Sequence, residues 1–242
     1  MGLLPEFIDN KLSFVKYLAA TGKRMLGGSV KECVCCGYQG TFRGYGRPPR
    51  FDALCPSCGS LERHRLLAGW VKANLPLVSS AKVLHFAPEQ VVKDLLKRLA
   101  GSYVSADIDP ARADIVIDIE KIALPEKSID IVVCSHVLEH VNDRAALAEI
   151  HRILVPGGLA ILMFPIVEGW AHTYEDASVT SEEGRLAHFG QEDHVRYYGA
   201  DVRDRIRAAG FDLEEVTAEG TDVLKYGLVR GEKIFLARRP AS

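Results

Sequence analysis

The chain has 242 residues, with 30 lysines and arginines against 32 acidic residues and a formal net charge of −2. This length allows one α/β domain of ordinary size plus a small appendage, and the near-neutral charge gives no general attraction to nucleic acid. No apolar run approaches the roughly 20 residues of a membrane-spanning helix, and the start, MGLLPEFIDNK, lacks the pattern of a secretory leader. We therefore expect a cytoplasmic protein without a membrane span.

Residues 1–30 predict a helical segment, because apolar residues recur there at the spacing of one helix face. These residues are Leu4, Phe7, Ile8, Leu12, Val15 and Leu18. Such a stripe either packs on the protein's own core or lies on a membrane surface beside the flanking lysines. The sequence leaves the role of this segment open.

Residues 31–65 predict a zinc ribbon, because they carry two matching hooks, Cys33-x-x-Cys36-Gly37 and Cys55-Pro56-Ser57-Cys58-Gly59, with 18 residues between them. Two residues between cysteines let both sulfurs reach one ion, and two hooks complete a tetrahedron. A closed four-sulfur site leaves no position for water, so the expected Zn²⁺ is structural. Free buried thiols are the alternative, and Cys35 could replace Cys36 as a ligand.

The loop between the hooks, TFRGYGRPPRFDAL, mixes arginines with aromatic residues. This mixture could bind RNA or a phosphorylated ligand, or it could be a solvated ribbon loop. The residues concerned are Arg43, Arg47 and Arg50 with Phe42, Tyr45 and Phe51.

A linker helix is expected over 66–80, and the main domain over 81–242. Strand and helix patterns alternate there, which predicts an α/β fold: a mostly parallel, Rossmann-like sheet with helices on both faces. Expected strands are 83–86, 103–106, 115–117, 129–134, 159–164, 211–216 and 233–237, and expected helices are 88–100, 144–154 and 200–209. Residues 166–198 are too long for a plain connection and are interpreted as an inserted lid.

The first strand ends at His85-Phe86-Ala87-Pro88-Glu89, where a dinucleotide fold would have glycines. Those glycines let a pyrophosphate approach the backbone, so their absence argues against NAD and ATP and suits an adenosine without phosphates. Asp107 lies 22 residues after His85 at the end of the second strand, where a carboxylate can accept both ribose hydroxyls. S-adenosylmethionine is a ligand that meets both conditions.

The stretch DIEKIALPEKSIDIVVCSHVLEHVNDRAALAEIHRILVPGGLAILMFPI carries a family resemblance. It resembles the class I S-adenosylmethionine-dependent methyltransferases of the type-11 group in its Leu138-Glu139-His140 and its Leu154-x-Pro156-Gly157-Gly158. The resemblance covers about residues 81–238 and implies a seven-stranded sheet with a final antiparallel strand. It departs from the family at the first turn, where Gly-x-Gly is missing and Glu89 could replace a lost contact to the cofactor.

From the residues and this resemblance together, the expected cofactor contacts are His85, Phe86, Ala87, Glu89, Asp107, Ile108, Asp118, Ile119, Ser135 and His136. The resemblance implies that Asp107 holds the ribose, that Asp118 and Ile119 flank the adenine, and that Ser135 and His136 line the methionine end. If the acceptor is a hydroxyl, a base is needed, and His136 or His194 is the candidate. Residues 136–140 also match the His-x-x-Glu-His pattern of a zinc peptidase family, a minor alternative.

The expected activity is methyl transfer to an oxygen or nitrogen of a small molecule or sugar. An RNA methyltransferase is the runner-up, and it requires a basic face that joins arginines of the ribbon and the following helix. A non-catalytic scaffold is a further alternative. The residues of that basic face would be Arg43, Arg47, Arg50, Arg63 and Arg65.

Overall fold

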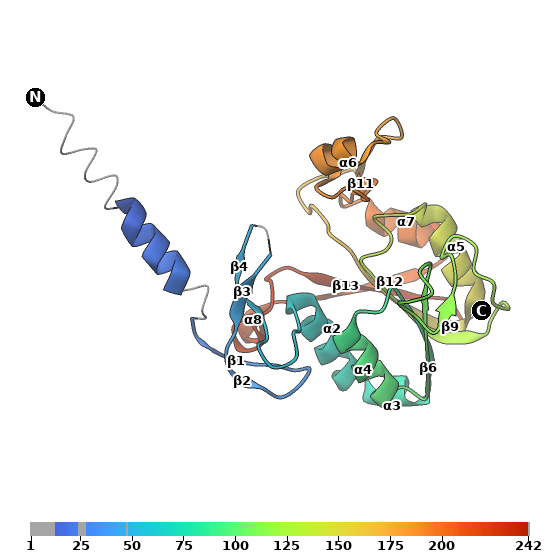
Figure 1. Ribbon diagram of the computed structural model, residues 1–242. Helices are drawn as coiled ribbons and strands as arrows, with labels where there is room; N and C mark the ends of the chain where they lie inside the picture. The colour runs from blue at the N-terminus through green and yellow to red at the C-terminus, as the bar shows by residue number, and fades with distance from the viewer. Residues whose placement is uncertain (1–12, 24–27, 47, 242) are drawn as a thin grey trace, which may run out of the picture. The chain divides into compact units, whose positions relative to one another are not determined.

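The computed structural model describes residues 13–23, 28–46 and 48–241 (Figure 1). Their contacts divide them into two compact units. The first unit holds residues 13–70 and 218–232, and the second holds residues 71–217 and 233–241. None of the described helices is long and apolar enough to cross a membrane.

The first unit contains two small antiparallel hairpins. Strand β1 (Val30–Glu32) pairs with β2 (Gln39–Thr41), and β3 (Arg43–Tyr45) pairs with β4 (Arg50–Leu54). Helix α2 (Glu62–Ala73) follows and is separated by Asn74 from α3 (Leu75–Ser80), so two helices occupy the place of the predicted linker helix. The division between the units falls within α2.

Residues 13–23 form a helix, as the apolar spacing predicts. Val15 and Leu18 are 59% and 51% exposed, so the described part of the stripe is not packed against the protein's own core. Leu4, Phe7, Ile8 and Leu12 lie outside the described residues. Of the two alternatives for this stripe, packing on the protein's own core is therefore not met at Val15 and Leu18.

Residues 218–232, which follow the sixth strand of the main sheet in sequence, belong to the ribbon unit. They carry helix α8 (Gly220–Tyr226), whose Lys225 forms an ion pair with Glu32 of β1 at 3.3 Å. The buried Arg65 of α2 donates hydrogen bonds to the carbonyl oxygens of Tyr226 and Gly227. These residues fall within the range expected for the main domain, 81–242, but their contacts group them with the ribbon residues.

The second unit is built on one seven-stranded sheet, in the order β12-β13-β9-β8-β5-β6-β7. Five strands are parallel, and β13 runs antiparallel to both β9 and β12. This confirms the predicted seven-stranded fold with its antiparallel strand. The strands are β5 (Lys82–Phe86), β6 (Ser102–Asp107), β7 (Ile115–Val116), β8 (Ile129–Ser135), β9 (Leu154–Met163), β12 (Asp212–Thr217) and β13 (Lys233–Arg238).

Helices cover the sheet because alternate strand residues are apolar on each face. Leu84 and Phe86 of β5 join one buried cluster with residues of α5 (Asp143–Ile153) and α7 (Val202–Ala208). Val83 and His85 alternate with them and are also buried. Helix α4 (Gln90–Leu99) connects β5 to β6 and buries Val92, Leu95 and Leu96.

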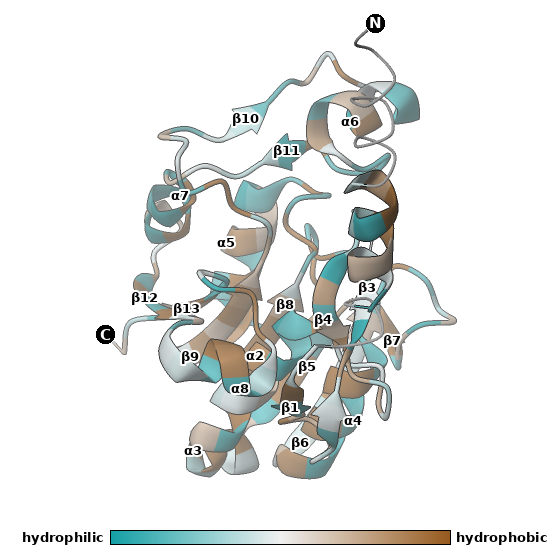
Figure 2. Cartoon of the chain, turned by 90° about the vertical axis from the view of Figure 1, so that its left-hand side faces the viewer, coloured by the Kyte–Doolittle hydropathy of each residue, from teal (hydrophilic) through white to brown (hydrophobic). Residues whose placement is uncertain are grey.

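The predicted insertion at 166–198 forms a small substructure of its own. It contains β10 (Tyr174–Glu175), α6 (Glu182–Phe189) and β11 (Arg196–Tyr197), with β10 antiparallel to β11. Figure 2 shows β10 and β11 as hydrophilic, in contrast to the brown central strands of the sheet. Its attachment is nevertheless buried, since Arg196 donates to the carbonyl oxygens of Leu138 and Val141.

Candidate active site

The candidate site lies at the carboxyl ends of the neighbouring strands β5, β6 and β8. The chain passes from β5 to β6 and β7 on one side of the sheet, and β8 and β9 lie on the other side. Such a switch of direction, at the carboxyl ends of parallel strands, is where open α/β sheets bind ligands. A cavity of about 570 Å³ lies there, a volume that suits a cofactor-sized ligand. Its lining includes Phe86, Ala87, Asp107, Ile108, Asp118, Ile119, His136, His140, Arg185 and Asp193.

The turn after β5 has a glycine-like backbone without a glycine. Ala87 has φ = 46°, in the left-handed region that residues with a Cβ seldom adopt. Its N–H donates to the carbonyl oxygen of Ala106 on β6 at 2.9 Å, which holds the turn in place. Ala87 therefore provides the close backbone approach for which other nucleotide-binding folds use glycine.

Asp107 ends β6 as a buried carboxylate with one oxygen uncommitted. The residue is 7% exposed, and its Oδ1 accepts a hydrogen bond from the Asp109 N–H at 3.0 Å. Its Oδ2 has no hydrogen-bond partner among the described residues, and the nearest cation, Arg112 Nε, lies 3.7 Å away. A buried oxygen without a donor is costly, so this geometry fits a ligand hydroxyl.

Two further segments give the cavity its apolar and polar surfaces. Ile108 is 75% exposed, which is unusual for an isoleucine and leaves an apolar surface beside Asp107. Ile119 is buried, whereas the neighbouring Asp118 is exposed and uses its Oδ1 to accept the Glu120 N–H at 2.9 Å. This combination suits a flat, partly polar ring such as adenine.

The structure does not bring every predicted contact to this cavity. His85 is fully buried, with its Nδ1 3.0 Å from the Tyr103 hydroxyl, because it lies on the sheet face opposite Phe86. Glu89 is the residue before α4, and it does not line the cavity. Ser135 is also outside the lining, although its buried Oγ has no hydrogen-bond partner among the described residues. His85, Glu89 and Ser135 therefore lie outside the lining of the cavity.

His136 follows β8 directly and lines the cavity. Its φ of 55° is again left-handed, and its N–H donates to the carbonyl oxygen of Met163 at 2.8 Å. Its Nδ1 lies 3.1 Å from Oε1 of Glu139, a carboxylate that is 1% exposed. A buried carboxylate fixes the ring orientation and leaves Nε2 as the nitrogen that can take a proton.

The zinc peptidase alternative is wrong on geometry. That site needs two imidazoles one helical turn apart, but α5 begins only at Asp143, after residues 136–140. The group of possible metal ligands here is Glu139, His140 and His194, and it does not include His136.

His194 enters the site from the inserted segment, although it does not line the cavity. It is 4% exposed, and its Nδ1 donates to the Phe189 carbonyl oxygen at 3.2 Å. Burial lowers the pKa of His194 below its ordinary value, which favours a neutral ring. Its ring lies edge-on to that of His140, with centroids 4.6 Å apart. His140 lines the cavity but was not among the expected site residues, although its place in the Leu-Glu-His motif was an available signal.

In the ribbon unit, the four cysteines of the hooks form one cluster. The Cys33 and Cys58 sulfurs are 3.6 Å apart, and those of Cys36 and Cys55 are 3.8 Å apart. Tetrahedral zinc–thiolate bonds of about 2.3 Å place sulfurs about 3.8 Å apart, so the geometry fits Zn²⁺. Cys35 lies outside the cluster, with its sulfur 3.7 Å from the His64 carbonyl oxygen.

The two cysteine hooks have the same backbone conformation. Gly37 and Gly59 have φ of 79° and 72°, and their N–H groups donate to the carbonyl oxygens of Cys33 and Cys55. The glycines in the sequence hooks therefore serve a turn that residues with a Cβ disfavour.

The arginines proposed for an RNA-binding face do not all stay available for it. Arg65 is 1% exposed, and its guanidinium is held by carbonyl oxygens. Arg50 forms a two-bond pair with Glu62, at 2.8 and 3.2 Å. Arg47 lies outside the described residues. The described part of the ribbon therefore does not present the joined basic face that an RNA enzyme requires.

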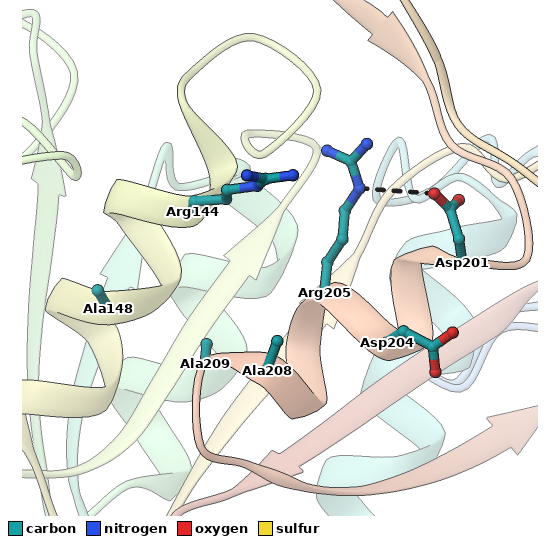
Figure 3. A pocket seen from close by; sticks show the side chains of 7 residues that line it. All are labelled: Arg144, Ala148, Asp201, Asp204, Arg205, Ala208 and Ala209. Carbon is teal, nitrogen blue, oxygen red and sulfur yellow. Dashed lines mark ion pairs between the residues drawn. The ribbon is translucent and has the colours of Figure 1, made fainter.

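A second cavity, of about 590 Å³, lies along α5 and α7 (Figure 3). Arg144 and Arg205 extend over it, and Arg205 Nε lies 3.8 Å from Asp201 Oδ2. The Arg205 guanidinium is already paired with Glu175 and Asp143. The cavity shares no residue with the strand ends, and we do not assign the cofactor to it.

Comparisons with known proteins find a matching family model and similar folds for the unit that holds the sheet. Residues 80–162 match the model of a family described as a methyltransferase domain. An S-adenosylmethionine-dependent methyltransferase from Mesorhizobium loti is similar in fold, with 16% identity and a TM-score of 0.51 over 72% of this chain and 98% of that one.

A second similar structure is a Burkholderia thailandensis 1,6-didemethyltoxoflavin-N1-methyltransferase with bound 1,6-didemethyltoxoflavin and S-adenosylhomocysteine. Its identity is 16% and its TM-score 0.51, over 73% of this chain and 78% of that one. The YcgJ protein of Bacillus subtilis has 13% identity and a TM-score of 0.51, over 74% and 100% of the two chains. No curated protein sequence matches the chain. Residues 80–162 are thus a methyltransferase domain, and the protein is a methyltransferase.

Proposed function

We propose that this protein transfers a methyl group from S-adenosylmethionine to an oxygen or nitrogen of a small molecule or sugar. The observation that carries the proposal is Asp107, a buried carboxylate whose Oδ2 lacks a hydrogen-bond donor at the edge of the cavity. Asp107 Oδ2 accepts hydrogen bonds from the ribose hydroxyls, and Ile108 and Ile119 flank the adenine together with Asp118.

The first turn supports the same cofactor. Ala87 brings the backbone close to the ligand in a left-handed conformation, while the turn has no run of glycine N–H groups for a pyrophosphate. A cofactor with an adenosine and no phosphate therefore fits better than NAD or ATP. The volume of about 570 Å³ suits a ligand of this size.

When bound, S-adenosylmethionine supplies an electrophilic methyl group on a positively charged sulfur. The protein's own contribution is alignment of the acceptor and exclusion of water, which account for much of the acceleration in such reactions. His136 acts as the base that removes the acceptor's proton through Nε2, because Glu139 holds its Nδ1. His194 is the alternative base, with its Nδ1 bound to Phe189.

The inserted segment contributes to acceptor recognition. Arg185 of α6 and Asp193 line the cavity, and Arg185 Nε is a buried donor without a hydrogen-bond partner among the described residues. A polar small molecule that accepts a hydrogen bond from Arg185 suits this wall. An RNA acceptor is disfavoured because Arg50 and Arg65 are committed within the ribbon unit.

The ribbon binds a structural Zn²⁺ through Cys33, Cys36, Cys55 and Cys58. The proposal rests on the sulfur separations and on the matching glycine turns, which leave no open position for catalysis. Metal binding would then supply much of the folding free energy of a unit with a small core.

Calorimetric titration with S-adenosylhomocysteine tests the cofactor assignment. Asp107→Asn keeps the shape but loses the charged acceptor, so we expect binding to weaken about 10- to 100-fold, as for a hydrogen bond to a charged group. Asp94→Asn is the matched control, because Asp94 is an exposed carboxylate on α4 that bonds Gln90. Absence of binding to the wild-type protein would favour the non-catalytic scaffold instead.

A further inference from the structure

We propose that Glu139, His140 and His194 form a second metal site, separate from the four cysteines, which binds a divalent cation of the Zn²⁺ type. One possible ligand atom from each residue lies within 4.8 Å of the others. Two imidazoles and one carboxylate with open positions are a common catalytic metal set. The site itself stands on this geometry, and its catalytic role rests on the proposed methyltransferase function.

In both imidazoles Nδ1 lies beside an oxygen, which leaves Nε2 as the nitrogen available to a metal. His194 Nδ1 donates to the Phe189 carbonyl oxygen at 3.2 Å, and His140 Nδ1 lies 3.2 Å from Asp193 Oδ2. The Phe189 carbonyl accepts the Nδ1 proton of His194 and so places its lone pair on Nε2, while the ion pair with Asp193 on the Nδ1 side of His140 leaves the Nε2 of that ring available. Metal-binding histidines are typically held in this way, by a backbone carbonyl or a carboxylate behind the ring.

Glu139 provides the anionic ligand. It is 1% exposed, and its Oε1 is engaged by His136. Its Oε2 is buried and has no hydrogen-bond partner among the described residues. A buried carboxylate oxygen without a donor carries a large desolvation cost, which a cation would offset.

The fold fixes the distance between the two parts of the site. The Val195 N–H, from the inserted segment, donates to the Glu139 carbonyl oxygen at 2.9 Å, which places His194 beside Glu139. The rings of His140 and His194 contact each other edge-on at 4.6 Å. Residues far apart in the sequence are thus held as one cluster by backbone pairing as well as by side chains.

The cluster adjoins the cavity, since His140 and Asp193 are among the lining residues together with His136. A cation there would bind the hydroxyl oxygen of the acceptor and lower its pKa. The hydroxyl proton passes to His136 Nε2, the oxygen forms a bond to the methyl carbon, and the electron pair of the broken carbon–sulfur bond stays on sulfur. This assignment narrows the acceptor to one with a hydroxyl group.

Metal content after equilibration of the full chain with zinc tests the site. The wild-type protein should hold about two zinc ions per chain, and His194→Ala and His140→Ala about one, because the four-cysteine site is unaffected. His172→Ala is the control, since His172 is exposed and outside the cluster. Asp193→Asn should weaken the second site about 10- to 100-fold, as the loss of a carboxylate behind a metal-binding imidazole does.

One zinc ion in the wild-type protein, or an equal zinc content in wild type and His194→Ala, would overturn the proposal. Glu139→Gln separates loss of a ligand from misfolding as the cause of zinc loss. It keeps the side-chain volume and should still lose the second zinc ion. A parallel titration with S-adenosylhomocysteine separates the two proposals. Cofactor binding with one zinc ion refutes only the metal site, and two zinc ions without cofactor binding refute only the cofactor assignment.

Discussion

At the scale of single residues, the candidate site depends on two strained positions. Ala87 and His136 both have positive φ, at the ends of the adjacent strands β5 and β8. Left-handed backbone costs a residue with a Cβ about 1 kcal/mol or more, and such strain collects at functional sites because the surrounding structure holds it. Here hydrogen bonds from Ala87 N–H to Ala106 and from His136 N–H to Met163 hold the two turns.

Ala87→Gly should stabilise the protein by about 0.5–1 kcal/mol, because glycine adopts this φ without a clash. The free energy of unfolding in urea measures the change. Ala100→Gly is the control: Ala100 has φ of −77°, so glycine there should destabilise by about 0.5 kcal/mol. Equal losses in the two variants would show that the turn at Ala87 is not strained.

At the scale of elements, the ribbon is two copies of one turn. Each hook pairs a cysteine carbonyl with a glycine N–H and directs its sulfurs to the same point. The core of this unit that includes the cysteines is small, with Phe42 as its large apolar member. The hairpins therefore depend on the metal more than on apolar burial.

Cys36→Ser should lose about one zinc ion per chain and unfold the hairpins, whereas Cys35→Ser should keep the metal. Both positions lie in the same hook, so the pair separates a ligand from a bystander. Zinc content and hydrogen–deuterium exchange of residues 30–58 give the two readouts. Metal loss in Cys35→Ser with retention in Cys36→Ser would reverse the ligand assignment.

The inserted segment is held by buried charge at its attachment. Arg196 forms an ion pair with Glu175 at 3.0 Å and lies 3.8 Å from the buried Asp143. Arg205 also bonds Glu175, and these bonds lower the pKa of Glu175 and keep it ionised. Removing one partner of such a network leaves the others buried and unpaired.

Arg196→Met should therefore destabilise the protein by about 3 kcal/mol and speed exchange in residues 174–198. Arg207→Met is the matched control, because Arg207 is an exposed arginine on α7 whose only ion-pair partner among the described residues is Asp204. Its effect should stay within about 0.5 kcal/mol. Similar losses from both arginines would argue against a buried network as the attachment.

At the scale of the whole molecule, local sequence patterns were enough to predict the strands of the sheet. They were not enough to predict which side chains meet in the candidate site. Short continuous apolar runs, separated by helix patterns, predict all seven strands, because a strand that is buried on both faces needs apolar residues on both. The same reasoning placed Asp107 at a strand end. It also proposed His85, which lies outside the cavity lining, since β5 is buried on both faces and the pattern does not say which face meets a ligand.

Contacts between residues far apart in the chain could not be predicted from local sequence patterns. Helix α8 belongs to the same unit as the ribbon hairpins, although most of the chain separates them in sequence. No local sequence pattern predicts this grouping. The cluster of Glu139 and His140 with His194 depends on the backbone bond from Val195 to Glu139. The burial of Arg65 likewise needs the carbonyl groups of Tyr226 and Gly227.

A crystal structure of the protein grown with S-adenosylhomocysteine tests the central claim most directly. We predict density across the ends of β5, β6 and β8, with both ribose hydroxyls bonded to Asp107 and the sulfur directed towards His136. Density in the cavity of Arg144 and Arg205, or a ligand that leaves Asp107 Oδ2 without a donor, would contradict the account.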